Sequence, residues 1–182
     1  DQPRSRGLGD VYKRQVVDYQ VDFVDGALGF PGAEKLEQII LDKIANCRST
    51  GGQVIFTLDT HGEEYLSTAE GRKLPVPHCI KGTPGHALYG RVAEAVKPDD
   101  IVIEKPAFGS LELADLLRRL APEEAELCGL VTDICVISNA VIAKAALPES
   151  RVTVDHSACS CADPEAHERA LAVMRGVQID VI

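Results

Sequence analysis

The sequence predicts a single α/β domain in which parallel strands are covered by helices on both faces. Short apolar, β-branched segments alternate along the chain with segments of helical periodicity. Several apolar segments are nearly continuous, which is typical of strands buried on both faces. This alternation favours right-handed crossovers between parallel strands, and hence a three-layer sandwich. The chain of 182 residues has the length of one domain.

The predicted strands are short segments rich in valine, isoleucine and leucine. They lie at residues 15–21, 53–58, 100–104, 126–131, 151–154 and 177–182. The first of them contains Asp18 within an otherwise apolar run, and the fourth leads through Gly129 toward Cys135. Each strand is followed by polar residues, so the strand ends are the places to search for a site.

Four longer segments have helical patterns. They lie at residues 32–49, 110–120, 134–146 and 164–175. In the first, Leu36, Ile40 and Ile44 fall on one stripe. Ser110 and Asp163 are the expected N-caps of the second and fourth helices. The third helix is apolar nearly all round, and we expect it to be the most buried.

The first fifteen residues do not fit this pattern. Residues 1–15 are polar, lack periodicity and run into the first strand without a turn, and 7–15 resemble translated sequencing-adapter read-through. We therefore expect residues 1–15 to be a non-native segment and residues 16–182 to form a single domain.

Composition excludes several classes of protein. The net charge is −9 and the basic residues are scattered, which argues against nucleic-acid binding. The sequence has no apolar run of about 18 residues and no recognisable secretory signal, so we expect a cytoplasmic protein that does not interact with membranes. For the same reasons we expect the 6 cysteines to be reduced rather than paired in disulfides.

Chemically capable side chains follow four successive predicted strands. Asp18 lies in the first strand, Asp59 and His61 follow the second, Lys105 follows the third, and Cys135 follows the fourth. Ligands of such sheets bind outside the carboxyl ends of the strands. The pattern therefore predicts that an acid, a cation, a thiol and candidate metal ligands converge there.

Cys135 has the best setting of the six thiols for a nucleophile. A helix N-terminus and a neighbouring ammonium group such as Lys105 would lower the thiol pKa. The alternatives are structural: Cys135 as a small core residue, Asp18 as a loop cap and Lys105 as an exposed lysine. The residues alone leave both interpretations open.

Asp59, His61 and His78 supply oxygen and nitrogen donors from a strand end and the next loop. Such a set suits zinc, iron or manganese with open positions for water. Glu64 and Glu70 are further possible ligands, and the spacing by itself is a weak signal. By contrast, the Cys159-x-Cys161 motif lacks a second pair with zinc-finger spacing.

Together these residues resemble the isochorismatase-like cysteine hydrolases, and within them the nicotinamidase-like branch. The resemblance covers 16–182 and rests on five ordered motifs. These are the segments 17–23 (VDYQVDF), 59–61 (DTH), 77–83 (PHCIKGT), 105–108 (KPAF) and 129–136 (GLVTDICV).

The resemblance implies a six-stranded parallel sheet and assigns a role to each strand-end residue. Asp18, Lys105 and Cys135 would form the catalytic triad. The amides of Val131 and Cys135 would form an oxyanion hole, beside a cis peptide between Leu130 and Val131. Asp59, His61, His78 and, as in some members, Glu70 would bind one divalent metal ion, for which we expect zinc, with iron or manganese as alternatives.

The resemblance also implies hydrolysis of a primary carboxamide through a thioester, with nicotinamide giving nicotinate and ammonia in NAD salvage, a part of pyridine nucleotide biosynthesis. Phe23, Tyr65 and Phe108 would line the substrate pocket. Pro75 stands where many nicotinamidases have an aromatic residue, which leaves N-carbamoyl and ureido amides open as substrates. A catalytically silent oligomeric member is a further alternative. A homodimer or homotetramer is expected.

Overall fold

The computed structural model describes residues 12–182 and contains a six-stranded sheet of order β3-β2-β1-β4-β5-β6, in which all neighbouring strands are parallel. The strands are β1 (Tyr12–Val17), β2 (Gln53–Asp59), β3 (Ile101–Lys105), β4 (Glu124–Leu130), β5 (Arg151–Ser160) and β6 (Asp180–Val181). The predicted sheet is thereby confirmed. Most of the segment interpreted as foreign, residues 1–11, lies outside the described part of the chain.

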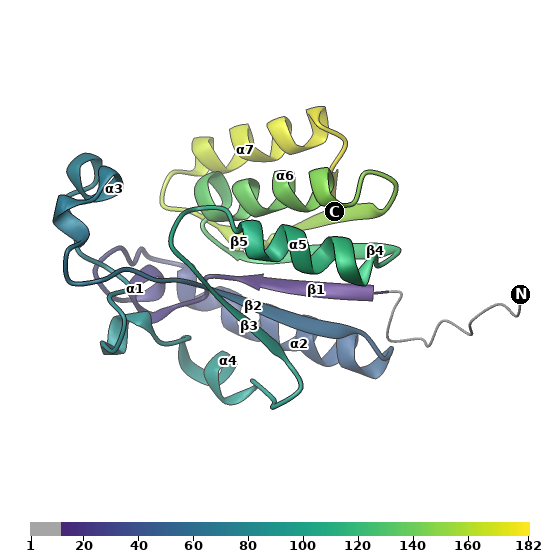
Figure 1. Cartoon of the computed structure of the whole chain (residues 1–182), viewed down its shortest axis with the longest axis horizontal. Coiled ribbons are helices and arrows are strands. Elements are labelled where there is room, and N and C mark those ends of the chain that lie inside the picture. The colour runs from purple at the N-terminus through teal and green to yellow at the C-terminus, as the bar shows by residue number, and fades with distance from the viewer. Residues whose placement is uncertain (1–11) are drawn as a thin grey trace, which may run out of the picture.

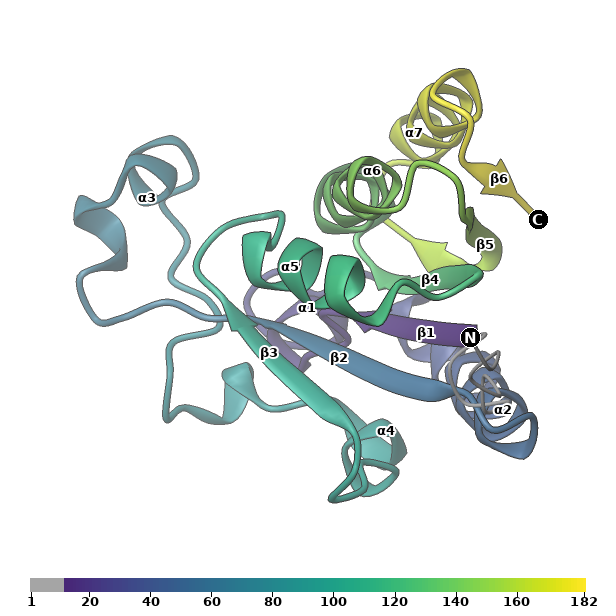
Figure 2. The ribbon, with the colours of Figure 1, turned by 45° about the vertical axis from the view of Figure 1, so that its right-hand side comes forward.

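Helices cover both faces of this sheet (Figures 1 and 2). One face carries α2 (Leu36–Ser49) and α4 (Gly90–Glu94), and the other carries α5 (Leu111–Leu120), α6 (Ile137–Ala146) and α7 (Pro164–Gly176). Ser110 Oγ accepts from the Leu113 amide and Asp163 Oδ1 from the Glu165 amide, which confirms both predicted caps. The three-layer architecture is therefore present.

Short helical segments that the sequence did not predict gather near the carboxyl ends of the strands. They are α1 (Val21–Val24), α3 (Ala69–Lys73) and the 3₁₀ turns Tyr65–Ser67 and Pro84–His86. A further 3₁₀ turn, Ala33–Lys35, takes the place of the first turn of the helix predicted at 32–49. Figure 1 shows α3 projecting beyond the end of the sheet toward which β1 points. These segments form the walls above the strand ends.

The first strand lies earlier in the chain than predicted. It spans Tyr12–Val17, not 15–21, because Asp18 has φ 43° and turns the chain out of the sheet. Arg14 pairs in register with Glu126 of β4, and its guanidinium lies 3.0 Å from the Glu126 carboxylate. Residues 12–15 thus belong to the sheet.

The last two strands also differ from the prediction. β5 continues to Ser160, well beyond residue 154, because pairing with β4 resumes after a register shift at Gly129↔Cys159. Its second half is polar, so an apolar pattern could not find it. β6 is limited to Asp180–Val181, since residues 177–179 form the turn that ends α7, in which the Ile179 amide donates to the Met174 carbonyl at 3.0 Å.

The core lies between the sheet and its helices and includes Val16, Phe56 and Leu127 from the central strands. Among the described residues, no helix is both long enough and apolar enough to cross a bilayer.

Candidate active site

Asp18 lies directly after β1, buried beneath the helices at the end of the sheet. Thr57 Oγ1 donates a hydrogen bond of 2.8 Å to Asp18 Oδ1. Lys105 Nζ lies 2.6 Å from Asp18 Oδ2. Both carboxylate oxygens therefore have a partner, as a fully buried carboxylate requires.

Lys105 is the last residue of β3 and is only 1% exposed, so it is not a lysine of the protein surface. Its ammonium group lies 3.5 Å from Cys135 Sγ and 3.4 Å from Asp59 Oδ1, and donates to the Ala107 carbonyl at 3.0 Å. One cation therefore connects the predicted acid, the predicted nucleophile and a predicted metal ligand.

Cys135 lies in a π-helical turn, Thr132–Val136, between β4 and α6. The approach to this turn depends on Gly129, which has φ 121°; a Cβ there would stand 2.0 Å from the Val17 carbonyl oxygen. Only glycine allows β4 to lie this close to β1. The thiol is consequently held beside Lys105 and Asp18 with 3% of Cys135 exposed.

The protonation state of Cys135 differs from the sequence-based expectation. We expected Lys105 and a helix N-terminus to lower the thiol pKa. Burial instead raises the pKa of Cys135 well above its usual value, and the Asp18 carboxylate adds to this effect more than Lys105 opposes it. Burial likewise raises the pKa of Asp18 despite its ion pair with Lys105. The resting site holds a thiol next to a base of increased proton affinity.

A cavity lies above the strand ends and is here called the main cavity; Val131 and Cys135 both line it. The peptide between Leu130 and Val131 is cis, as the resemblance implied. The oxyanion hole predicted from the amides of Val131 and Cys135 stays a prediction.

The four predicted metal ligands come together beside this triad. Atoms of Asp59, His61, Glu70 and His78 that could ligate a metal all lie within 4.8 Å of one another. Asp59 Oδ2 is 3.0 Å from His61 Nε2 and 3.3 Å from His78 Nε2. Two carboxylates and two imidazoles form a donor set that suits zinc, iron or manganese.

Two observations show that this cluster fits a divalent cation. The Val76 carbonyl, 2.8 Å from His78 Nδ1, can only accept a hydrogen bond, so Nδ1 carries a proton and Nε2 of the neutral ring is free to ligate. Asp59 and Glu70 place carboxylate oxygens 3.0–3.6 Å from Nε2 of both His61 and His78. The pocket between these side chains therefore favours positive charge.

The main cavity, of about 280 Å³, joins the candidate metal cluster to the Cys135 thiol. Its walls include Asp59, Glu70 and His78 on one side and Cys135 on the other. Three phenylalanines also line it, namely Phe23, Phe30 and Phe108. Phe30 was not predicted from the sequence. The cavity thus presents an apolar, aromatic surface to a ligand that can reach both the thiol and the metal ligands.

Tyr65, predicted as a wall of the substrate pocket, lies elsewhere. It is 1% exposed and packs behind the cluster, with ring centroids 4.7 Å from His61 and 5.0 Å from His78. Its hydroxyl donates to the Leu74 carbonyl at 2.9 Å and lies 3.4 Å from Glu70 Oε1. Because its polar end must find a partner on burial, Tyr65 supports the histidines and Glu70 instead of contacting a ligand.

Gln20 lies within the motif 17–23, and the sequence predicted no role for it. Its amide is fully buried and holds the backbone of Asp59 on both sides: Nε2 donates to the Asp59 carbonyl at 2.9 Å, and Oε1 accepts from the Asp59 amide at 2.8 Å. Nε2 also donates to the His86 carbonyl at 2.8 Å. Gln20 therefore fixes the residue that lies between Lys105 and the histidines.

Asn139 was missed altogether, although it is a polar residue in an apolar helix. Its Nδ2 donates to the carbonyls of Cys135 and Phe108 at 2.8 and 3.0 Å, and its Oδ1 accepts from the Ser110 amide at 3.1 Å. A buried amide must be hydrogen-bonded, and this signal could have found it. Asn139 ties the loop after Lys105 to the nucleophile's helix.

A buried thiol beside a lysine and an aspartate, at the carboxyl ends of a parallel sheet, defines the class of protein as a cysteine hydrolase of the three-layer α/β type.

Comparison with known proteins identifies the family. The model of the isochorismatase domain matches residues 16–182, and the chain belongs to the isochorismatase family. It is 33% identical over 168 residues to the isochorismatase family protein PncA of Bacillus subtilis, covering 86% of this chain and 90% of that protein.

Two further relatives have names that state an activity. The nicotinamidase/pyrazinamidase of Mycobacterium tuberculosis is 27% identical, with 92% of this chain and 96% of that protein covered. The crystal structure of the pyrazinamidase of Pyrococcus horikoshii in complex with zinc superposes with a TM-score of 0.81 at 28% identity, over 94% of this chain and 98% of that one. The chain is therefore a hydrolase of amide C–N bonds, with a cluster that can hold a divalent metal ion.

Proposed function

We propose that this hydrolase converts nicotinamide to nicotinate and ammonia through a thioester on Cys135, and so acts in NAD salvage. The observation that carries the proposal is the position of Lys105 Nζ, 2.6 Å from Asp18 Oδ2 and 3.5 Å from Cys135 Sγ, at the base of a phenylalanine-lined cavity. A flat aromatic ring fits such walls, and its carboxamide would reach the thiol.

In the first half of the reaction, Asp18 takes the thiol proton as Cys135 Sγ forms a bond to the amide carbon. Lys105 stabilises the negative charge on sulfur during this transfer. The amides of Val131 and Cys135 would hold the oxyanion of the tetrahedral intermediate. When the C–N bond breaks, Asp18 returns its proton to the leaving nitrogen, ammonia departs and the acyl group remains on sulfur as a thioester.

In the second half, Asp18 acts as the base for water. It takes a proton from a water molecule whose oxygen attacks the thioester carbon. The C–S bond then breaks, nicotinic acid is released, and the proton returns to the Cys135 sulfur. The raised pKa values of both Asp18 and Cys135 suit this exchange, because each group can hold the proton in turn.

Asp59, His61, Glu70 and His78 would hold the metal ion, for which we propose zinc, with iron or manganese as alternatives. When bound, the ion would supply a positive charge that orients the pyridine ring nitrogen or a water molecule. Tyr65 and Gln20 keep these ligands in place through Glu70 and the Asp59 backbone.

The decisive experiment is release of ammonia from nicotinamide by metal-loaded wild type and by the Cys135→Ala variant. We expect turnover only in the wild type, while the variant still binds nicotinamide in calorimetry. Ammonia release that survives in Cys135→Ala would rule out the thioester.

Pro75 motivates a second candidate, an N-carbamoyl or ureido amide. Pro75 is exposed and lies outside the main cavity, so the aromatic contact expected at that position of many nicotinamidases is missing. Phe30 contributes an aromatic ring to the cavity from another segment. A panel of nicotinamide, pyrazinamide, an N-carbamoyl amino acid and a ureido acid separates the two candidates; preference for the last two would favour the second.

A further inference from the structure

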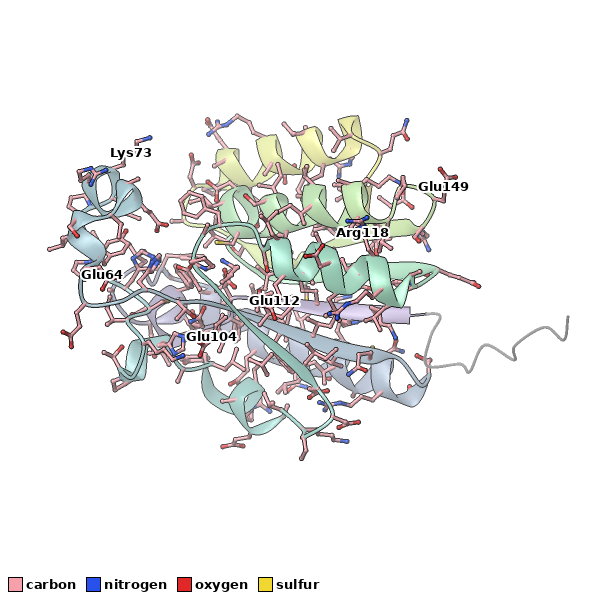
Figure 3. The ribbon with its side chains drawn as sticks, in the orientation of Figure 1. Glu64, Lys73, Glu104, Glu112, Arg118 and Glu149 are labelled. Carbon is pink, nitrogen blue, oxygen red and sulfur yellow. The ribbon has the colours of Figure 1, made fainter. Side chains whose placement is uncertain are left out.

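A second cavity, of about 480 Å³, lies on the other side of the metal cluster. Its walls come from α3 and from the loop after β3, and include Thr68, Ala69, Lys73, Pro106 and Ala107. Figure 3 shows Lys73 on α3, at the end of the molecule opposite Glu149. His61 lies at its inner wall, whereas Asp59 and His78 face the main cavity. The two cavities therefore approach the cluster from different sides.

Three residues line both cavities and form the partition between them: Glu70, Leu74 and Phe108. Glu70 is a candidate metal ligand and Leu74 accepts the Tyr65 hydrogen bond through its carbonyl. Phe108 is neither a candidate metal ligand nor a hydrogen-bond partner of Tyr65, and it is 41% exposed. Its side chain is therefore the part of the partition that can change without disturbing the metal cluster.

The backbone beneath Phe108 is fixed independently of its ring. The Phe108 carbonyl accepts from Asn139 Nδ2 at 3.0 Å, and the Ala107 carbonyl accepts from Lys105 Nζ at 3.0 Å. The loop ends at Ser110, whose backbone amide donates a hydrogen bond of 3.1 Å to Asn139 Oδ1. Shortening the Phe108 side chain should therefore open the partition and leave the loop in place.

The sizes of the cavities decide what this partition does. Ligand pockets commonly enclose about 300–1,000 Å³. The main cavity, at about 280 Å³, lies just below that range and suits a single ring. The second cavity has room for a further ring, and the alanine, proline and leucine in its wall present apolar surface to one.

We propose that Phe108 is a specificity-determining residue that confines the substrate to one-ring amides, and that the second cavity is a latent subsite for the outer ring of a bicyclic aromatic amide. This inference rests on the proposed amidase function, since it concerns the substrate range of that site.

The test compares nicotinamide with quinoline-3-carboxamide, which carries a second fused ring. We expect the wild type to favour nicotinamide, and Phe108→Ala to raise the ratio of kcat/KM for the bicyclic amide over nicotinamide at least about tenfold, because a change of even one methylene in an apolar pocket alters discrimination about 10–200-fold. Phe108→Leu should give an intermediate ratio. Leu111→Ala is the matched control, since Leu111 is 78% exposed, lies nearby at the start of α5 and lines neither cavity.

Binding measurements separate this inference from the proposed function. In a Cys135→Ala background, calorimetry gives the affinity of both amides with and without Phe108→Ala, whether or not turnover occurs. If neither amide is hydrolysed by the wild type but the affinity ratio shifts about tenfold, the proposed function fails and the role of Phe108 stands. An unchanged ratio in Phe108→Ala and Phe108→Leu, or a wild type that already accepts the bicyclic amide equally well, overturns the inference.

Discussion

Two clusters of charged and titratable groups lie on the same sheet, one fully buried and one partly buried, and their environments shift the pKa values of their members differently. The cluster to which we assign catalysis, here called the catalytic cluster, lies at the carboxyl ends of the strands and consists of Asp18, Lys105 and Cys135. The ionic cluster, between α2 and strands β4 and β5, consists of Lys43, Glu126 and Asp155. In each cluster one lysine contacts two acidic groups: Lys105 contacts the Asp18 carboxylate and the Cys135 thiol, and Lys43 contacts the carboxylates of Glu126 and Asp155.

The pKa shifts separate the two clusters. In the ionic cluster burial alone would disfavour charge, but the contacts win: Lys43 has a raised pKa and Asp155 a lowered one, so both are held ionised. In the catalytic cluster burial wins at Asp18 and Cys135, whose pKa values both rise. In the ionic cluster the two carboxylates are matched by two cations, Lys43 and the neighbouring Arg14, so the charged forms are stabilised and the cluster is structural. An excess of proton-binding groups around one lysine gives a cluster that can exchange a proton.

Replacing the lysine of each cluster should produce the largest difference between the two clusters, both in the free energy of unfolding and in kcat. Lys105→Met leaves Asp18 and Asp59 buried without their cation, so we expect a loss of about 3–5 kcal/mol in the free energy of unfolding and about 10²–10⁴-fold in kcat. In the matched variant Lys43→Met, Glu126 keeps its contact with Arg14, so the expected loss is about 1–2 kcal/mol with kcat unchanged. Urea unfolding and ammonia release measure both, and similar kcat values in the two variants would contradict the comparison.

A second test concerns Gln20, which holds the backbone of Asp59 next to the catalytic cluster. Gln20→Ala removes the side chain that holds both backbone groups of Asp59, so we expect zinc affinity to fall about 10–100-fold in competition with a chelator. Gln53→Ala is the control, because Gln53 lies at the opposite end of β2 and its amide donates to the Asp99 carbonyl at 2.8 Å. Equal zinc affinity in the two variants would show that Asp59 needs no such support.

Gln15 shows what burial does to a polar group that belongs to neither cluster. It is 5% exposed on β1, and neither its amide nitrogen nor its amide oxygen has a hydrogen-bond partner among the described residues. Gln15→Leu should therefore increase the free energy of unfolding by about 1–2 kcal/mol, measured by urea unfolding. A loss of stability would mean that the site around Gln15 cannot accept an apolar side chain.

The smallest expected effect is the pH dependence of the ionic cluster. Burial would raise the pKa of Asp155, but hydrogen bonds from Lys43 and Ser157 lower it below its usual value of about 3.9. The resulting stabilisation is present at neutral pH and is lost as the pH falls through the lowered folded-state value. The free energy of unfolding of the wild type, measured by urea unfolding, should exceed that of Asp155→Asn by about 1 kcal/mol at neutral pH, and this difference should shrink on acidification. A difference that stays constant down to about pH 3 would exclude ionisation of Asp155 as its cause.

The sequence by itself determined the order of strands and helices, because hydrophobic periodicity is a local property of the chain. It also placed Asp18, Lys105 and Cys135 near strand ends, and the parallel topology requires such residues to meet at one edge. The donor atoms of Asp59, His61 and His78 indicated a candidate metal site, and the family resemblance favoured Glu70 over Glu64 as its fourth member.

Only the tertiary structure decided the details that depend on contacts between distant segments. Asp18 ends β1 through a positive φ, and Arg14 joins the sheet through Glu126, neither of which an apolar pattern encodes. Burial from all sides made the Cys135 pKa rise where one neighbouring lysine predicted a fall. Tyr65 faces the cluster and not the cavity, and Phe108 lies between two cavities, because walls are assembled from loops whose paths no local pattern specifies.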